Sequence, residues 1–507
     1  MSRGTRKNCK TLPFSVKFAV KILPFRAVSA FQNLPFCAKY AVKNLLFRAD
    51  GIKIKNRDNI MAFYRKIYQK LLIWKKESNG STVLLLSGAR RIGKSFLCEQ
   101  FGKNEYKSMI IIDFGNIPNE IREIFENDSS DLDMFFAKLS AFYRTHLFKR
   151  ESLIVFDEVQ LFPYARQLLK YLVCDGRYDY METGSLLSLK QNVKDIVIPS
   201  EEEEIQMFPM DFEEFLLALG DETTVPLLRS CFERKKLLGQ ALHRRIMNDF
   251  RQYLLVGGMP QAVMEYVTSK DFARTDKVKK QILTLYRNDI AKYAGSYKNK
   301  VTAIFDELPG QLSKKEKKYK LSSINKNARL RGYEDAFLWL NDGMIANPCF
   351  NVTDPNVGLA LSGDHATQKI YMADTGLLVT HTFKDNDYSD NELYRAILLD
   401  KLNINEGMLL ENAAAQMLRC NGHRLFFYSR VDNNNRENMM EIDFLIAKRK
   451  KICPVEVKSS HYQTHSSIDK FRRRFSSKLG DAYILYTKDI MVKNNIIHLP
   501  VYMAMFL

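Results

Sequence analysis

One segment of this chain has the residue types and spacing of a phosphate-binding loop. The sequence GARRIGKS, Gly88–Ser95, fits the pattern G-x-x-x-x-G-K-[ST], in which successive backbone N–H groups surround a phosphate. Gly88 and Gly93 allow positive φ and a close approach of backbone to phosphate. Lys94 would reach the β- and γ-phosphates of ATP, and the Ser95 hydroxyl would bind Mg²⁺. The residues expected to contact the nucleotide are Gly88, Arg91, Gly93, Lys94, Ser95 and Phe96.

A pair of carboxylates follows a second apolar run, 153–156, which we expect to be a buried strand. Asp157 and Glu158 would lie at its carboxyl end, where ligands bind in open α/β sheets. We expect Asp157 to hold Mg²⁺, directly or through water. We expect Glu158 to act as the general base that polarises the attacking water.

A third polar group ends the next predicted strand, 178–185. Either Thr183 or Ser185 could sense the γ-phosphate from a position between the first two motifs. The alternative is that this Thr-Gly-Ser sequence is only a turn. We include Thr183, together with Asp157, among the residues predicted to bind the nucleotide.

The last third of the chain carries a second set of chemically capable residues. Asp443 and Glu456 fall on two predicted neighbouring strands, and Lys458 lies on the same strand face as Glu456. The two carboxylates could hold one Mg²⁺ or Mn²⁺, with Glu411 from a preceding helix completing the site. Lys458 could then activate a water, so Asp443, Glu456 and Lys458 are candidate catalytic residues. The domain could be an active nuclease, or an inert or binding-only relative.

The elements that must position these residues predict an α/β fold. Apolar runs at 83–87, 109–113, 153–157, 178–185 and 205–210 are predicted strands, and helical patterns lie between them. This alternation predicts a parallel sheet with helices on both faces. The strand at 109–113, between the loop strand and the Asp157 strand, suggests the AAA-type arrangement. A helix is expected over 211–219, with Asp211 as its N-cap.

The middle of the chain, 212–345, is predicted to be mainly helical. Gly257–Pro260 should end one helix and start the next. In the basic helix 277–294, Arg287 could sense the γ-phosphate or be structural.

Two short predicted helices, 321–328 and 333–340, precede possible strands at 341–351 and 368–373, as in a winged helix. Such a fold could contact DNA through Lys326 and the basic residues of 314–320 and 329–331. We favour the alternative that it packs between the nucleotide and C-terminal domains, because a fold does not by itself imply a function.

The first sixty residues differ from the rest of the chain. They hold 13 Lys and Arg against 2 Asp, and so carry +11 of the net +19. Residues 12–27 are nearly repeated at 34–49. The segment could be a spurious extension or a disordered tail with Met61 as the true start. It could also be a targeting or membrane-surface segment.

The composition suggests a cytoplasmic protein. The eight cysteines are scattered without a C-x-x-C pair, which favours reduced thiols. No run approaches the length of an apolar membrane span, so no membrane partner is expected. We expect four segments: the extension 1–60, a P-loop ATPase domain 61–220, a helical and winged-helix-like region 221–395, and a C-terminal domain 396–507.

Several motifs together resemble a known family. They are Trp74–Ser78, Gly88–Ser95, Phe156–Gln160, Thr183–Ser185, Pro209–Phe215, Gly257–Pro260, Tyr371–Leu378, Glu411-Asn412, Glu441–Phe444 and Val455–Lys458. The set resembles prokaryotic AAA-type ATPases that carry a C-terminal domain of unknown function with a PD-(D/E)xK, restriction-endonuclease-like core. The resemblance covers residues 61–507 and implies ATP binding and hydrolysis.

These patterns lead to one hypothesis with two alternatives. The chain is expected to be a Mg²⁺-dependent ATPase whose nucleotide state controls the C-terminal nuclease-like module, with DNA as the candidate partner. One alternative is a nucleotide-gated switch or partner-binding protein with little turnover. The other is an ATP-regulated DNA nuclease.

Overall fold

The computed structural model describes residues 63–184, 201–314, 318–324, 329–383, 406–430, 439–460 and 466–507. The repeat-bearing extension, Ser185 and Lys326 fall outside these ranges. The described residues between Phe63 and Leu507 cluster as one compact unit. The six cysteines within them are free thiols. In these ranges we find no helix that is both long and apolar enough to cross a membrane.

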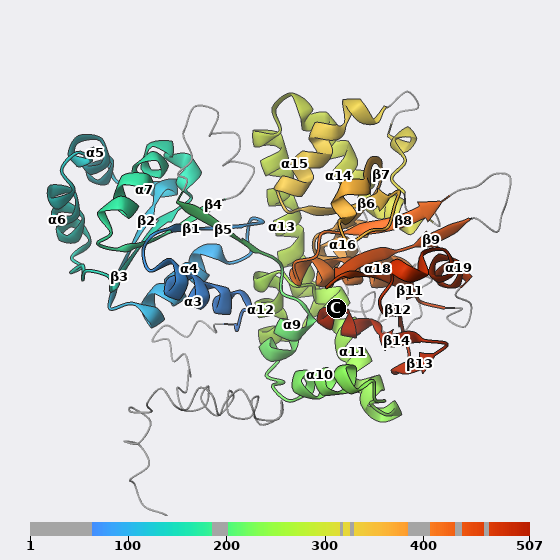
Figure 1. Ribbon diagram of the computed structural model, residues 1–507. Helices are drawn as coiled ribbons and strands as arrows, with labels where there is room; N and C mark the ends of the chain where they lie inside the picture. Colours follow the sequence, from blue (N-terminus) through green and yellow to red (C-terminus); the bar gives the residue numbers. More distant parts are fainter. Residues whose placement is uncertain are drawn as a thin grey trace, which may run out of the picture. The chain divides into compact units, whose positions relative to one another are not determined.

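A five-stranded parallel sheet carries the phosphate-binding loop and the Asp-Glu pair (Figure 1). Its strand order is β2-β3-β4-β1-β5. The strands are β1 (Val83–Gly88), β2 (Ser108–Asp113), β3 (Ser152–Asp157), β4 (Asp179–Gly184) and β5 (Glu202–Met207). All five predicted strands are present. In the sheet β4 lies between the loop strand β1 and the Asp157 strand β3, and β2 is the outer strand beside β3.

The predicted fifth strand, 205–210, was placed three residues too late. Glu202, Glu203 and Glu204 pair in register with Val83, Leu84 and Leu85 of β1. Three successive glutamates do not resemble a buried strand in the sequence. They can form one here because β5 is the edge of the sheet, where the acidic side chains reach solvent.

Helices cover both faces of this sheet, which explains the continuous apolar runs. Val83 and Leu85 of β1 pack with the helices on one face, and Leu84 and Leu86 pack with those on the other. The first face is covered by α5 (Asn119–Asp128), α6 (Leu132–Tyr143) and α7 (Pro163–Asp175). The second is covered by α3 (Ile67–Ser78) and α4 (Lys94–Glu105).

The middle of the chain is mainly helical, as predicted. Its helices are α9 (Phe212–Ala218), α10 (Thr224–Arg234), α11 (Gln240–Val256), α12 (Pro260–Ser269), α13 (Phe272–Tyr293), α14 (Lys298–Ser313), α15 (Glu334–Asp342) and α16 (Thr375–Thr382). Asp211 caps α9 by accepting a hydrogen bond from the Glu214 N–H, as expected. The Gly-Gly-Met-Pro segment separates α11 from α12, also as expected.

The predicted wing strands do not form a free wing. β6 (Ala346–Val352) and β7 (Gly363–Met372) pair antiparallel, but β6 also pairs with β8 (Phe426–Arg430) of the C-terminal region. With β9 (Met440–Ile442) they form one sheet in the order β7-β6-β8-β9. Of the predicted helix 321–328, the described part is a single 3-10 turn at Leu321–Ser323.

The C-terminal sheet is mixed. It contains β10 (Phe444–Lys448), β11 (Lys451–Lys458), β12 (Ala482–Tyr486), β13 (Met491–Lys493) and β14 (Ile496–Pro500), in the order β10-β11-β12-β14-β13. β11, β12 and β14 are parallel neighbours, and the outer strands are antiparallel. The buried helix α18 (Glu406–Cys420) carries Glu411, as predicted, and the basic helix α19 (Ser466–Phe475) lies between β11 and β12 in the chain.

The strand that was predicted to carry Asp443 is divided in two at that residue. β9 pairs with β8 in one sheet, and β10 pairs with β11 in the other. The Asp443 carboxylate accepts a hydrogen bond of 2.9 Å from the backbone N–H of Val457. Asp443, the residue between the two strands, thus contacts the backbone of β11. The alternation of apolar residues along the sequence could not have shown where the strand breaks.

Candidate functional site

The phosphate-binding loop lies between β1 and α4, and two of its residues have the left-handed backbone conformation. Gly93 has φ of 91° and Arg91 has φ of 67°. Gly88 does not have positive φ, contrary to the expectation from the motif. A Cβ at Gly88 would lie 2.7 Å from the carbonyl oxygen of Met207, so close packing against β5 excludes a side chain there. Arg91 is exposed, and Phe96 is half-buried in the first turn of α4.

The Lys94 side chain folds back into the loop. Its Nζ donates to the carbonyl oxygens of Gly88, at 3.0 Å, and Ala89, at 3.1 Å. Burial lowers the pKa of Lys94, and the nearby carboxylates of Glu158 and Asp157 oppose that change. A weakly hydrated ammonium beside a curl of backbone N–H groups is suited to binding a polyphosphate.

Three predicted residues meet at one edge of the sheet: Ser95 in the first turn of α4, Asp157 at the end of β3 and Thr183 near the end of β4. The Ser95 Oγ donates to the Asp157 Oδ1 at 2.9 Å, and the Thr183 Oγ1 donates to the same oxygen. The register of β3 against β4 pairs Phe156 with Glu182, which puts Asp157 beside Thr183. A hydroxyl and a carboxylate at this spacing are oxygen donors of the kind that Mg²⁺ prefers.

Glu158 turns away from the strand that delivers it. Its φ is 54°, an uncommon conformation for a residue with a side chain. Its backbone N–H donates to the Thr183 Oγ1 at 3.3 Å, and its carboxylate accepts from Gln160 Nε2 at 2.5 Å. Thr183 therefore contacts both members of the Asp-Glu pair.

The second predicted site has a different centre from the one expected. Among the described residues, no group of three or more His, Cys, Asp or Glu side chains is arranged to hold a metal ion. Instead, the Nζ of Lys369 lies 3.5 Å from Glu411 Oε1, 2.8 Å from Glu441 Oε1 and 3.2 Å from Asp443 Oδ1. Burial alone would lower the pKa of Lys369, but these three carboxylates raise it well above its usual value.

The other two predicted catalytic residues pair with each other. Lys458 Nζ lies 2.5 Å from Glu456 Oε1. Burial opposes the charge of Lys458, but Glu456 outweighs it and raises the pKa of the lysine. The structure thus brings Glu411, Asp443, Glu456 and Lys458 into one neighbourhood, but each carboxylate of the predicted metal set contacts a lysine.

Three family models match parts of this chain. Residues 80–216 match the family model of the AAA domain. The match supports an AAA-type fold for these residues, which we call the AAA domain. Residues 247–388 and 406–503 match two domains of unknown function, DUF8612 and DUF4143.

Solved structures similar to this chain include two archaeal proteins. One is a Walker-type ATPase of Pyrococcus abyssi, with 17% identity and a TM-score of 0.39, over 64% of this chain and 97% of that one. The other is the Orc1 protein of Aeropyrum pernix in complex with DNA, with 13% identity and a TM-score of 0.26, over 65% of this chain and 95% of that one. No curated protein sequence matches this chain significantly.

Residues outside the motifs hold the loop of the AAA domain. Arg65, which precedes α3, donates to the carbonyl oxygens of Ile92 at 3.2 Å and Phe208 at 2.6 Å. Arg90 of the loop pairs with Asp289 of α13 at 2.5 Å. Sequence reasoning missed Arg65 and Asp289 because neither spacing nor a motif places α13 or the residues before α3 against the loop.

Arg287, the candidate sensor on α13, pairs with Asp306 of α14. Its guanidinium also lies over the ring of Phe305. These contacts favour the structural alternative. The helix contacts the loop through Asp289, two residues further along.

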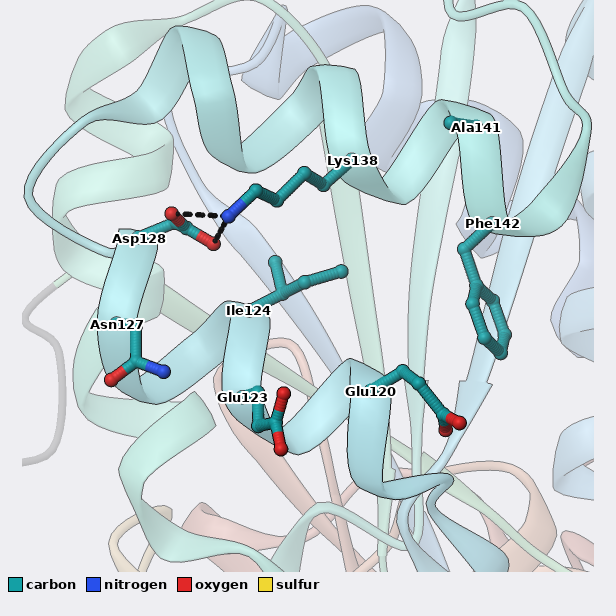
Figure 2. Close-up of a pocket in the computed structure, with 8 residues that line it drawn as sticks. All are labelled: Glu120, Glu123, Ile124, Asn127, Asp128, Lys138, Ala141 and Phe142. Atoms are coloured by element: carbon teal, nitrogen blue, oxygen red, sulfur yellow. Dashed lines mark hydrogen bonds and ion pairs between the residues drawn. The ribbon is translucent and has the colours of Figure 1, made fainter.

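The AAA domain also has a surface hollow of about 510 Å³ away from the loop, between α5 and α6 (Figure 2). Figure 2 shows Lys138 contacting both oxygens of Asp128, at 2.6 and 2.7 Å. Glu120 and Glu123, on α5 like Asp128, also line the hollow (Figure 2). This hollow contains none of the predicted nucleotide-binding residues.

Proposed function

We propose that the AAA domain binds ATP and hydrolyses it in a Mg²⁺-dependent reaction. The observation that carries this proposal is the hydrogen bond between Ser95 and Asp157, which joins the phosphate-binding loop to the carboxylate strand. Ser95 and Asp157 would hold Mg²⁺, which would neutralise charge on the phosphates when bound. Their oxygen donors fit that ion.

The roles of the remaining residues follow from their positions. The Lys94 ammonium would leave its loop carbonyls and bind the β- and γ-phosphate oxygens. Glu158 would orient a water and accept its proton as the water oxygen bonds to the γ-phosphorus and the bond to the ADP oxygen breaks. Thr183 would hold Asp157 and the Glu158 backbone in place, so that the carboxylates keep their positions through the reaction.

ATP binding and turnover by the full chain test this proposal. We expect Mg²⁺-dependent phosphate release by the wild type and its loss in Lys94→Ala. Lys103→Ala is a matched control, because Lys103 lies on the same helix and forms an exposed ion pair with Glu99. Phosphate release by Lys94→Ala at the wild-type rate would contradict the proposal.

We further propose that nucleotide state is transmitted to the C-terminal region. Support comes from a series of buried hydrogen bonds that begins at the end of the AAA domain. Met210 N–H donates to the Gly258 carbonyl at 2.7 Å, and Gly258 N–H donates to Asp374 Oδ2 at 2.5 Å. Gln416 Nε2 of α18 donates to the same carboxylate oxygen at 3.3 Å. Met207, three residues before Met210, packs against Gly88.

Hydrogen exchange in α18 tests this transmission. A non-hydrolysable ATP analogue with Mg²⁺ should change exchange over 406–420 in the wild type and in Lys103→Ala, but not in Lys94→Ala. If the wild type binds the analogue but exchange in α18 does not change, the proposed transmission is contradicted. The proposal that the AAA domain binds ATP is unaffected by that result.

DNA is the proposed partner of the C-terminal region. Support comes from a basic surface, defined as Lys448, Arg449, Lys450 and Lys451 of the β10–β11 turn with Arg473 and Arg474 at the end of α19. All six are exposed. Lys451 Nζ donates to the Ser477 carbonyl at 2.7 Å, which holds the turn beside the segment after α19. Clustered basic side chains of this kind bind phosphate backbones.

Binding of a duplex oligonucleotide at several salt concentrations tests the partner. Arg473→Ala/Arg474→Ala should weaken binding and reduce the slope of log affinity against log salt by about 0.9 for each phosphate that the protein no longer neutralises. Lys103→Ala, on the AAA domain, should leave the slope unchanged. Equal affinity and slope in all three proteins would contradict the assignment of this surface.

A nucleotide-gated switch is a second candidate, favoured by the hydrogen bond between Glu158 and Gln160. A general base held by a neighbouring amide is less free to activate water, so binding without turnover is the outcome expected of a switch. Gln160→Ala separates the two: faster phosphate release than the wild type would favour the switch.

A further inference from the structure

The carboxylate cluster of the C-terminal region is built around a lysine. Lys369 lies on β7, and its side chain is 1% exposed. Its ammonium contacts Glu411 on α18, Glu441 on β9 and Asp443 between β9 and β10. Three separate elements therefore direct a carboxylate toward one buried amine. The ammonium also lies over the ring of Phe427, 5.1 Å from its centre.

Further contacts fix the carboxylates in this arrangement. The Tyr371 hydroxyl donates to Glu411 Oε1, the same oxygen that faces Lys369. The second oxygen of Asp443 accepts from the Val457 N–H at 2.9 Å. Lys369 and Tyr371 are two residues apart on β7 and so share one face of the strand. The β7 strand thus supplies both a cation and a hydroxyl to the cluster.

Lysine ammonium groups contact every carboxylate of the predicted metal set. The nitrogen–oxygen distances of 2.8 to 3.5 Å are those of an ion pair. Mg²⁺ requires oxygen ligands at about 2.0–2.1 Å. Glu456, which would have been the third ligand of the predicted metal set, instead contacts Lys458. The residues present therefore do not fit the metal that the nuclease-like pattern implies.

We propose that Lys369 is a tethered cation that takes the place of a divalent metal in the C-terminal region. It neutralises the buried carboxylate of Glu411 and the partly exposed carboxylates of Glu441 and Asp443, which would otherwise repel one another. The region consequently acts without metal-dependent cleavage of nucleic acid. This inference is independent of ATP hydrolysis, because its residues belong to the β7-β6-β8-β9 sheet, the C-terminal sheet and α18, and not to the sheet that carries the phosphate-binding loop.

The proposal predicts that removing the lysine creates a requirement for an added cation. In Lys369→Ala the carboxylates lose their counter-charge, and a divalent ion that binds only the folded state restores stability by mass action. The full chain without nucleotide is unfolded thermally with and without millimolar Mn²⁺. Lys369→Ala should unfold several degrees below the wild type without Mn²⁺ and recover most of that loss with it, whereas the wild type should not shift.

Lys279 provides the matched control. It is also 1% exposed, but its ammonium forms an ion pair with Asp276 at 3.8 Å and donates to the Leu255 carbonyl at 2.6 Å, so it is not ringed by three carboxylates. Lys279→Ala should lose stability and show no recovery with Mn²⁺. A recovery equal to that of Lys369→Ala would show a general effect of the ion and would overturn the proposal, as would a soluble Lys369→Ala that gains nothing from Mn²⁺.

Direct Mn²⁺ binding by the wild type decides the matter even if Lys369→Ala does not fold. Electron paramagnetic resonance titration without nucleotide should show no Mn²⁺ site that depends on Asp443. A site present in the wild type and absent in Asp443→Ala would overturn the proposal, as would plasmid cleavage that is lost in the same variant.

Discussion

Ser95 Oγ and Asp157 Oδ1 lie 2.9 Å apart, although 62 residues separate them in the chain. The contact exists because β1 and β3 are parallel strands of one sheet with β4 between them, so their carboxyl ends reach the same edge. Thr183 of β4 occupies the intervening position and bonds to the same oxygen. The proposed chemistry therefore depends on the ends of β3 and β4 and on the start of α4, which the sheet brings together.

Removing the Thr183 hydroxyl should slow turnover more than it weakens binding. In Thr183→Val the side-chain shape is kept, but the hydrogen bonds to Asp157 and the Glu158 N–H are lost. Loss of a hydrogen bond to a charged group predicts a fall in kcat of about 10- to 100-fold, with KM for ATP within a few-fold. Steady-state kinetics check this split. The control is Thr268→Val, on the exposed face of α12, whose kcat and KM should match those of the wild type. A rise in KM with unchanged kcat in Thr183→Val would contradict the positioning role of Thr183.

Gly258 should not tolerate a side chain. A Cβ at this residue would lie 2.0 Å from the Met210 carbonyl oxygen, a backbone atom that cannot rotate away. Gly258→Ala should therefore lower the free energy of unfolding by about 1–3 kcal/mol or more. Chemical denaturation measures the change.

Gly310→Ala, in α14, is the control for Gly258→Ala, because there is space for a side chain at Gly310. The nearest atom to a Cβ there is the end of the Glu307 side chain, at 3.9 Å. Gly310→Ala should stabilise the chain by about 0.5–1 kcal/mol, since alanine is the better helix residue. Equal effects of the two substitutions would show that the close contact between Gly258 and Met210 does not exist in solution.

Lys279 should make stability depend on pH in the alkaline range. Burial lowers its pKa from 10.5 to about 8, with Asp276 opposing the change. Between these two values the unfolded chain binds more protons than the folded chain, so the free energy of unfolding rises with pH. Relative to Lys279→Met, the wild type should gain about 3 kcal/mol across this window. Denaturation at several pH values measures the difference.

Lys277→Met controls for the loss of a lysine from the same helix, because Lys277 is exposed. Its difference from the wild type should stay constant over the window. If Lys279→Met shows the same constant difference, the lysine is not held in a poorly hydrated position.

The sequence predicted the nucleotide site because its parts are local. A buried strand, a glycine-containing loop and a helix follow one another within Val83–Glu105, and parallel pairing then aligns the strand ends. The C-terminal site was only half predictable. Lys369 lies 74 residues before Asp443, and nothing in the spacing shows that β7 joins β8 and β9 in one sheet. Of the carboxylates that contact Lys369, Glu411 and Asp443 were in the predicted set, but Glu441 and the lysine itself were not.

The break at Asp443 was missed for a related reason. Met440–Ile446 has the alternation of a single strand, and the change of partner from β8 to β11 depends on a tertiary contact. Likewise, Asp289 reaches the loop only because α13 packs beside it. Such contacts between distant elements are set by packing, which a single sequence does not display.

ATP turnover by Glu158→Gln, measured beside ATP binding by the same protein, tests the central claim most directly. Glutamine keeps the size of the side chain and its bond to Gln160 but cannot accept a proton. We predict that ATP affinity stays within a few-fold of the wild type while phosphate release falls at least about 100-fold. Phosphate release unchanged from the wild type would contradict the assignment of this site as the centre of ATP hydrolysis.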